Sequence, residues 1–300
     1  MKVTILGNNS ALPAFGRHPT CQIVSISGGL IMLDCGEGAQ IQMQRFGFRW
    51  RKLENIFISH LHGDHYFGLP GLVNSMSLLG RTAPLHVFGP AGLESIMQQI
   101  FDVAETVLAF PYYFHPLPEG AALLTENEFF KVSCFPVEHR IPCHGFLIER
   151  KTRGRKIDPE RCREYEIPAY FYDRLKAGED YTQKDGSVVK NEWVTEDGPS
   201  PRKYAFCADT RYSESYLPYI MDADTIYHEC TYVHAEVEKA HARFHSTSME
   251  AAEVALKANA KQLLLGHFSS KYKELDQFRE EAAAIFPNVL VTQEGVAYEI

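Results

Sequence analysis

The chain has 300 residues, of which 45% are hydrophobic and 23% are charged, and its formal net charge is −8. This composition excludes a disordered or fibrous protein, and the length suits one large layered domain with a full core. The acidic balance weakly disfavours a nucleic-acid partner, because neutralising phosphates usually requires an excess of Lys and Arg.

Short runs rich in Val, Ile and Phe predict strands along most of the chain. These strands are expected at residues 2–6, 21–26, 30–34, 55–59, 85–89, 129–137, 144–149, 203–208, 224–229, 262–266 and 288–292. The second and third should form a hairpin that turns at Gly28-Gly29.

Helical spacing of apolar residues predicts helices at 38–46, 92–101, 246–259 and 274–285. In the third, a Ser or Thr before Glu250 has the spacing of an N-cap. Strands cluster early and then alternate with helices, so we predict two sheets covered by helices rather than one doubly wound sheet.

One segment, residues 151–203, lacks core-like runs and is rich in Gly, Pro, Tyr and charged side chains. A loop of this length is unusual in a compact domain, so the segment is either functional or a protruding subdomain. It starts basic, because residues 149–156 hold five Lys or Arg against one Glu.

The seven cysteines are an odd number, widely spread and without a Cys-x-x-Cys pair, which indicates a reducing compartment rather than a disulfide framework. No apolar segment is long enough for a signal peptide or a membrane span. We therefore expect a cytoplasmic protein with no membrane partner.

Four metal-capable side chains, His60, His62, Asp64 and His65, follow the predicted strand at 55–59. Two residues apart, His60 and His62 project to the same side of an extended chain. Imidazole and carboxylate ligands suit zinc, manganese or iron better than calcium. Four ligands this close in sequence cannot easily converge on one tetrahedral ion, but two neighbouring ions could share them.

Three further candidates, His139, Asp209 and His267, each follow a predicted strand. Adjacent strands would bring them to one edge, although the residues alone leave open whether each is a ligand. The other histidines are expected to be ordinary core or surface residues: His18, His86, His115, His234 and His241.

Two ions about 3.5–4 Å apart can share a hydroxide and clamp a phosphoryl or acyl oxygen. Asp64 would orient that hydroxide while also serving as a ligand. His245, near a predicted helix start, is a free candidate to protonate the leaving oxygen, and Glu229 could hold it by a hydrogen bond. The alternatives are an ordinary helix N-terminal residue for His245 and a capping or surface carboxylate for Glu229.

Motifs along nearly the whole chain resemble the metallo-β-lactamase superfamily and, within it, the ribonuclease Z family of tRNA 3′-processing endonucleases. In order they are LDCGEGAQIQMQR, FISHLHGDHYFGLPGL, VEHRIPCHGF, CADTR, YHECTY, FHSTS and LGHFSSKY. The resemblance implies an α+β fold, a four-layer αβ/βα sandwich formed by one domain over 1–300. Residues 151–203 would be an inserted, protruding flexible arm that grips the tRNA elbow.

The resemblance also implies two zinc ions per subunit, with manganese or another divalent ion as an alternative. One ion would be held by His60, His62, His139 and Asp209, and the other by Asp64, His65, Asp209 and His267. Asp209 would bridge, Asp64 would accept a proton, and His245 and Glu229 lie in family motifs. His144 stands where relatives carry an aromatic residue and is not a predicted ligand.

The implied reaction is metal-hydroxide attack on precursor tRNA, which removes the 3′ trailer and leaves a 3′-hydroxyl. A homodimer without a nucleotide cofactor is implied, and a basic arm would allow an acidic protein to bind tRNA. Two departures from the family stand out. Ala169 and Tyr170 replace an arm Gly-Pro, and Phe15 and His18 replace Lys and Asn of an N-terminal loop.

Two other functions remain open. One is another dinuclear-metal phosphodiesterase or an arylsulfatase-like hydrolase on the same fold, working without the arm. The other is an RNA-binding or scaffold protein with a structural metal. The unassigned His245 argues against the second, because a structural site would close its coordination sphere.

Overall fold

The computed structural model describes residues 1–152, 154–198 and 200–300, and they divide into two compact units. The first unit comprises Met1–Glu149 and Arg202–Ile300, and the second comprises Arg150–Pro201. The second unit nearly coincides with residues 151–203, the segment that the sequence marked as a functional insertion or a subdomain.

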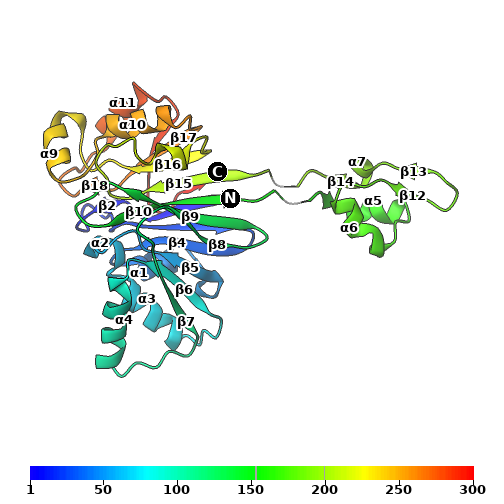
Figure 1. Ribbon diagram of the computed structural model, residues 1–300, viewed down its shortest axis with the longest axis horizontal. Helices are drawn as coiled ribbons and strands as arrows, with labels where there is room; N and C mark the ends of the chain where they lie inside the picture. Colours follow the sequence, from blue (N-terminus) through cyan, green and yellow to red (C-terminus); the bar gives the residue numbers. More distant parts are fainter. Residues whose placement is uncertain (153, 199) are drawn as a thin grey trace. The chain divides into compact units, whose positions relative to one another are not determined.

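Two seven-stranded sheets form the first unit, with helices on their outer faces (Figure 1). The first sheet has the order β20 (Ala297–Glu299), β1 (Lys2–Gly7), β3 (Cys21–Ile26), β4 (Gly29–Cys35), β5 (Leu53–Phe57), β6 (Leu85–Gly89) and β7 (Tyr112–Pro116). The second has the order β19 (Val289–Val291), β17 (Gln262–Gly266), β16 (Thr225–Glu229), β15 (Arg202–Cys207), β10 (Cys143–Arg150), β9 (Phe130–Val137) and β8 (Ala122–Glu126). The prediction of two helix-covered sheets is confirmed.

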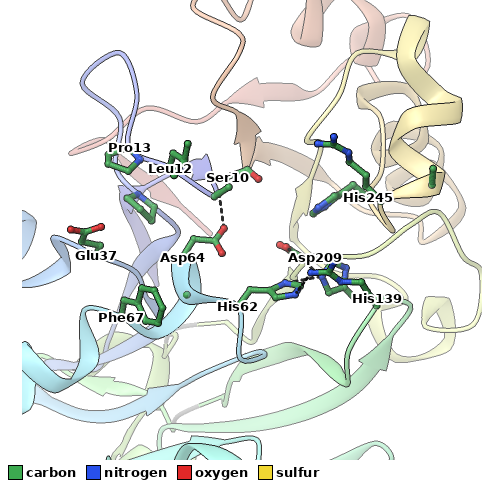
Figure 2. Close-up of a pocket in the computed structure, with 16 residues that line it drawn as sticks. Ser10, Leu12, Pro13, Glu37, His62, Asp64, Phe67, His139, Asp209 and His245 are labelled. Carbon is green, nitrogen blue, oxygen red and sulfur yellow. Dashed lines mark hydrogen bonds and ion pairs between the residues drawn. The ribbon is translucent and has the colours of Figure 1, made fainter. Parts of the chain in front are cut away.

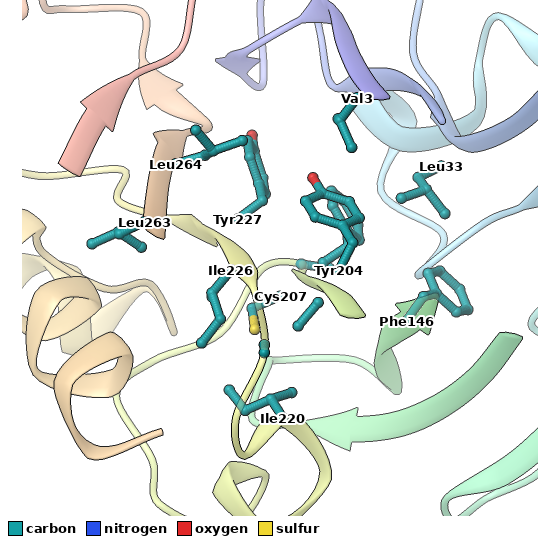
Figure 3. Close-up of a cluster of buried hydrophobic side chains, with 14 of the residues drawn as sticks. Val3, Leu33, Phe146, Tyr204, Cys207, Ile220, Ile226, Tyr227, Leu263 and Leu264 are labelled. Carbon is teal, nitrogen blue, oxygen red and sulfur yellow. The ribbon is translucent and has the colours of Figure 1, made fainter. Parts of the chain in front are cut away.

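Side chains along each strand of the first sheet point alternately to its two faces, and apolar side chains on both faces explain why both are covered. In β4, Ile31 and Leu33 face the core between the sheets, whereas Leu30 and Met32 face the outer helices. Figure 3 shows Leu33 in the same apolar cluster as Phe146 of the second sheet. These two layers of side chains hold the sandwich together.

A buried hydrogen bond also joins the sheets, because the Tyr204 hydroxyl of β15 donates to Gln22 Oε1 of β3 at 2.5 Å. The hairpin between β3 and β4 turns at Ser27 and Gly28, which have φ values of 48° and 85°. The turn therefore lies one residue earlier than predicted, because these two positions take the left-handed conformations that a tight hairpin requires.

Helices α1 (Ala39–Arg45), α3 (Leu69–Leu78) and α4 (Gly92–Val103) cover the first sheet, and α10 (Ser248–Lys257) and α11 (Asp276–Ala283) cover the second. A capping box begins α10. The Thr247 side chain accepts from the Glu250 backbone, and the Glu250 carboxylate accepts from the Thr247 backbone at 2.9 Å. The box fixes the N-cap of the helix at Thr247, two residues after His245.

The second unit has its own small core, formed by Cys162, Ile167, Phe171, Leu175, Val189 and Val194. Around it lie the helices α5 (Pro159–Glu164), α6 (Tyr172–Lys176) and α7 (Asn191–Val194) and the two-residue strands β11 (Lys156–Ile157), β12 (Tyr181–Thr182), β13 (Val188–Val189) and β14 (Thr195–Glu196). Asp158 caps α5 by accepting from the backbone of Glu160 and Arg161. These core residues are scattered singly along the segment, which agrees with the expected lack of long apolar runs.

All seven cysteines are buried and carry free thiols. Within the described ranges, each helix is too short or too polar to cross a membrane.

Candidate metal centre

Strand ends of both sheets deliver the metal-capable side chains to one place. Beyond the end of β5, the first sheet supplies His60 and His62, and the short helix α2 (Gly63–Tyr66) then carries Asp64 and His65. From the second sheet, His139 follows β9, Asp209 follows β15 and His267 follows β17. The structure thus brings all seven predicted ligands together in overlapping groups, and one group, Asp209, His245 and His267, also includes the predicted proton donor.

The first set contains His60, His62, His139 and Asp209, with candidate ligand atoms all within 4.8 Å of one another. His62 Nδ1 lies 3.0 Å from His60 Nε2 and 3.1 Å from His139 Nε2. Asp209 Oδ2 lies 3.6 Å from His60 Nε2 and 3.9 Å from His139 Nε2. Three imidazole nitrogens and one carboxylate oxygen therefore face a common point.

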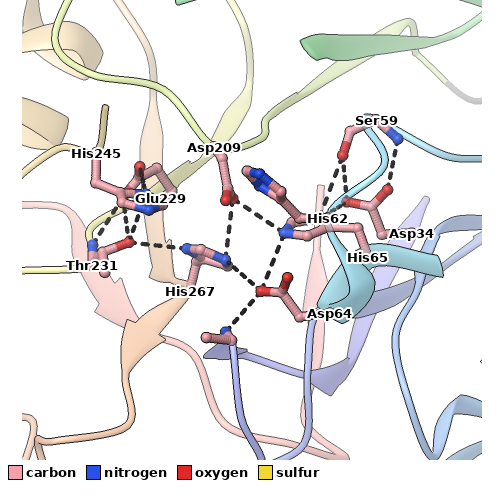
Figure 4. Close-up of polar contacts among 12 residues, drawn as sticks. Asp34, Ser59, His62, Asp64, His65, Asp209, Glu229, Thr231, His245 and His267 are labelled. Carbon is pink, nitrogen blue, oxygen red and sulfur yellow. Dashed lines mark hydrogen bonds and ion pairs between the residues drawn. The ribbon is translucent and has the colours of Figure 1, made fainter. Parts of the chain in front are cut away.

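The second set is built around the other oxygen of the same aspartate. Asp209 Oδ1 lies 3.3 Å from His65 Nε2 and 3.1 Å from His267 Nε2. Asp64 Oδ2 lies 3.5 Å and 3.4 Å from the same two nitrogens, and it also accepts a hydrogen bond from the Ala11 backbone. One carboxylate thus offers an oxygen to each set, as Figure 4 shows for the second.

These donor atoms fit divalent cations. His65 Nε2, His267 Nε2 and Asp209 Oδ1 are buried and have no hydrogen-bond partner. Burying such atoms without partners costs free energy that a bound cation would recover. Burial also lowers the pKa of His60 and of His139, so both rings stay neutral and able to bind a metal.

A second layer of hydrogen bonds orients the imidazole rings. His65 Nδ1 lies 2.7 Å from the fully buried Asp34, which also accepts from the backbone and hydroxyl of Ser59. His139 Nδ1 lies 2.9 Å from the Phe244 carbonyl oxygen. In each ring, Nε2 is therefore the nitrogen left for the centre.

His62 is turned the other way, with Nδ1 toward the first set. Its Nε2 lies 2.9 Å from a guanidinium nitrogen of Arg140. Because a neutral ring that binds a cation through Nδ1 carries its proton on Nε2, the Arg140 side chain would have to move away when the cation binds. The sequence did not single out either Arg140 or Asp34. A carboxylate at the end of the apolar run Leu30–Asp34 was the available signal for Asp34, because a buried carboxylate requires partners.

His245 and Glu229 form a pair beside the second set (Figure 4). His245 Nδ1 lies 2.7 Å from Glu229 Oε1, and the other carboxylate oxygen accepts from the Thr231 backbone and hydroxyl. The Thr231 hydroxyl oxygen is also 3.0 Å from His267 Nδ1. Burial lowers the pKa of His245, but the carboxylates of Glu229, Asp209 and Asp64 together outweigh burial and raise that pKa to about 9.

A cleft of about 750 Å³ opens over the centre and is lined by His62, Asp64, His139, Asp209 and His245 (Figure 2). The surrounding lining residues include Leu12, Pro13, Glu37, Phe67, Arg140 and Arg243. The predicted proton donor and the candidate ligands therefore face the same space, which is large enough to hold a phosphodiester group and its neighbours.

Three comparisons relate this chain to known proteins. It is 40% identical to a ribonuclease Z of Porphyromonas gingivalis, over 99% of this chain and 98% of the relative. It is 38% identical to a ribonuclease Z of Bacteroides fragilis, again over 99% and 98%. The crystal structure of the short form of human tRNase Z matches with a TM-score of 0.73 and 28% identity, over 100% of this chain and 99% of that one. The family described as Anti-Pycsar protein Apyc1 matches residues 1–151.

Proposed function

The chain belongs to the ribonuclease Z family and, over residues 1–151, to the family described as Anti-Pycsar protein Apyc1; we propose that its metal centre removes the 3′ trailer of precursor tRNA. It is a metal-dependent endoribonuclease, a phosphodiester hydrolase that acts at tRNA 3′ ends. The observation that supports this site is the meeting of seven candidate ligands under a cleft that is also lined by His245, whose ring is paired with Glu229.

In this proposal, one zinc ion would be held by His60, His62, His139 and Asp209, and a second by Asp64, His65, His267 and Asp209. Such a pair supplies a nucleophilic hydroxide at neutral pH and neutralises charge on the phosphate. The protein positions the ligand side chains through hydrogen bonds to their outer atoms. Asp64 accepts the proton of the nucleophile, since its carboxylate faces both the second set and the cleft.

His245 protonates the oxygen that departs as the tRNA 3′-hydroxyl. The ring lines the cleft, and the Glu229 carboxylate keeps the imidazole protonated and fixes its orientation. Glu229 is itself fixed, because Thr210 and Thr231 donate to it from the backbone. Glu229 is therefore a positioning residue, whereas His245 meets the substrate.

Purified protein should convert a precursor tRNA into a tRNA with a 3′-hydroxyl and a trailer with a 5′-phosphate. A chelator should abolish cleavage, and added zinc should restore it, because the centre supplies the nucleophile. Mapping both product ends after incubation with and without chelator checks this. Chelator-resistant cleavage, or products with a cyclic phosphate, would contradict the proposal.

The second unit serves as the tRNA-binding arm in this proposal. It contains eleven Lys or Arg and eleven Asp or Glu, so the whole net charge of −8 belongs to the first unit. A neutral unit with a basic start repels RNA less than the rest of the chain does. By family resemblance we propose a homodimer in which one subunit's arm presents tRNA to the other's site. The free thiols support a cytoplasmic location.

Removing Arg150–Pro201 should separate substrate binding from chemistry. Strands β10 and β15 are neighbours in the second sheet, so a short glycine turn can join Glu149 to Arg202. We expect kcat/KM for precursor tRNA to fall about 10²–10⁴-fold, because a second binding contact is lost. Hydrolysis of a small chromogenic phosphodiester should be unchanged.

Assays of both substrates with the same preparation check this expectation. The deletion variant should match the full chain in thermal unfolding and metal content. If its kcat/KM then fell equally on precursor tRNA and on the small phosphodiester, the result would favour the alternative of a small-phosphodiester or arylsulfatase-like hydrolase.

A further inference from the structure

The two walls of the cleft differ in chemistry. In Figure 2, Leu12, Pro13, Phe67 and Glu37 lie on one side of Asp64, and His245 lies on the other side, beyond Asp209. Arg243, two residues before His245, and Arg140, next to His139, also line the cleft. One wall is therefore apolar with a carboxylate, whereas the other carries the cationic groups.

The fold holds Phe67 in place without burying it. The residue follows helix α2 and is 61% exposed, and its ring packs over Gly63, where a Cβ would stand only 2.2 Å from a ring carbon. The Tyr66 ring meets it edge-on, with centroids 5.0 Å apart. One side of the ring is thus supported, while much of its surface remains open. Leu12 on the same wall is also 61% exposed.

We propose that the first nucleobase of the 3′ trailer stacks on Phe67. This inference rests on the proposed function, in which His245 protonates the oxygen that becomes the tRNA 3′-hydroxyl. That oxygen must lie toward His245, so the nucleotide on the other side of the broken bond lies toward the opposite wall. The first trailer base then meets Phe67, with Leu12 beside it.

A base suits this wall better than a phosphate does. Glu37 is exposed there and would repel a phosphate. The two Arg side chains among the described lining residues point to other partners, since Arg140 contacts His62 and Arg243 donates to the Tyr232 hydroxyl. An exposed aromatic ring binds any base through its face, and each such stack is worth about 1–3 kcal/mol. The wall therefore recognises a trailer of any sequence, provided that its first position carries a base.

A double-mutant cycle between protein and RNA tests this stack. The metal-loaded full chain and its Phe67→Ala variant are assayed on a precursor tRNA with an ordinary trailer and on the same RNA with an abasic first trailer nucleotide. The wild type should lose about 5- to 150-fold in kcat/KM when the base is removed. Phe67→Ala should show a loss of that size on the ordinary precursor and no further loss on the abasic one.

Two variants control for other causes. Phe67→Tyr keeps the aromatic face and should restore the preference for a base. Leu79→Ala removes a side chain that is 62% exposed outside the cleft lining and should behave as the wild type does. Metal content and thermal unfolding of Phe67→Ala verify that the centre and the fold are intact.

Equal cleavage of both precursors by the wild type would overturn the stacking inference and leave the endonuclease assignment standing. The stacking inference would also be overturned if Phe67→Ala on the abasic precursor lost the product of the two single fold-losses in kcat/KM. Two effects that multiply in this way are independent, so the ring and the base would not be in contact. Cleavage of neither precursor by the wild type would instead contradict the proposed function itself.

Discussion

An Asp209→Ala variant is expected to lose both its divalent metal and nearly all of its activity. Among the described residues, the Asp209 side chain is the one carboxylate that offers an oxygen to each set of ligands, 3.1–3.9 Å from four imidazole nitrogens. In the proposed two-ion centre, its removal would deprive both ions of an anionic ligand at once. We expect kcat/KM on precursor tRNA to fall at least about 10³-fold, because the metal pair acts as a unit.

Metal content after dialysis, measured by mass spectrometry, and cleavage rate are the two readouts for Asp209→Ala. An Asp102→Ala variant is the matched control, since Asp102 lies on α4 and its carboxylate accepts a hydrogen bond from Gln98, far in sequence from the candidate ligands. Asp102→Ala should retain metal and rate. Full metal occupancy in Asp209→Ala would show that the bridging role is wrong.

A His245→Ala variant should keep its metal and still lose about 10²–10⁴-fold in kcat, the usual contribution of a positioned proton donor. The ring lies against Glu229, and the ligands keep their own hydrogen bonds without it. A substrate with a good leaving group, which requires no proton, should lose much less. That difference separates proton donation from a structural role.

The pH profile adds a second readout for this pair. His245 must be protonated to donate, and the neighbouring Glu229 carboxylate raises its pKa above the ordinary value, so kcat should fall as the pH rises through that raised pKa. In Glu229→Gln the carboxylate is gone, the pKa of His245 drops, and the alkaline fall in kcat should move to lower pH. His115→Ala is the matched histidine control, since His115 lies on β7 beside His86. An unchanged alkaline limb in Glu229→Gln would contradict the role of Glu229.

Patterns of apolar residues predicted most of this fold, because each of the eleven expected strands has a counterpart. Helix α3 was missed, since its start at Leu69-Pro70-Gly71 reads as a turn; in the structure Pro70 occupies the first turn of the helix, where its missing N–H is harmless. Strands β7 and β8 were missed because their side chains are only partly buried and show little apolar alternation.

The meeting of the seven candidate ligands was predictable, because each lies just beyond the end of a strand. The hydrogen bonds behind them were not, since they depend on three-dimensional neighbours. Thr231 is an example: in sequence it follows Glu229 closely, but its hydroxyl lies between Glu229 and His267, which are brought together only when β16 pairs with β17.

Because the ligands come from both sheets, cations bound among them would act as a clamp across the sandwich. His60 and His65 extend from the first sheet, and His139, Asp209 and His267 extend from the second. Metal that binds only the folded arrangement stabilises it by mass action, in addition to the apolar core. Scarcity of metal would then weaken the enzyme twice, through its chemistry and through the cohesion of its two halves.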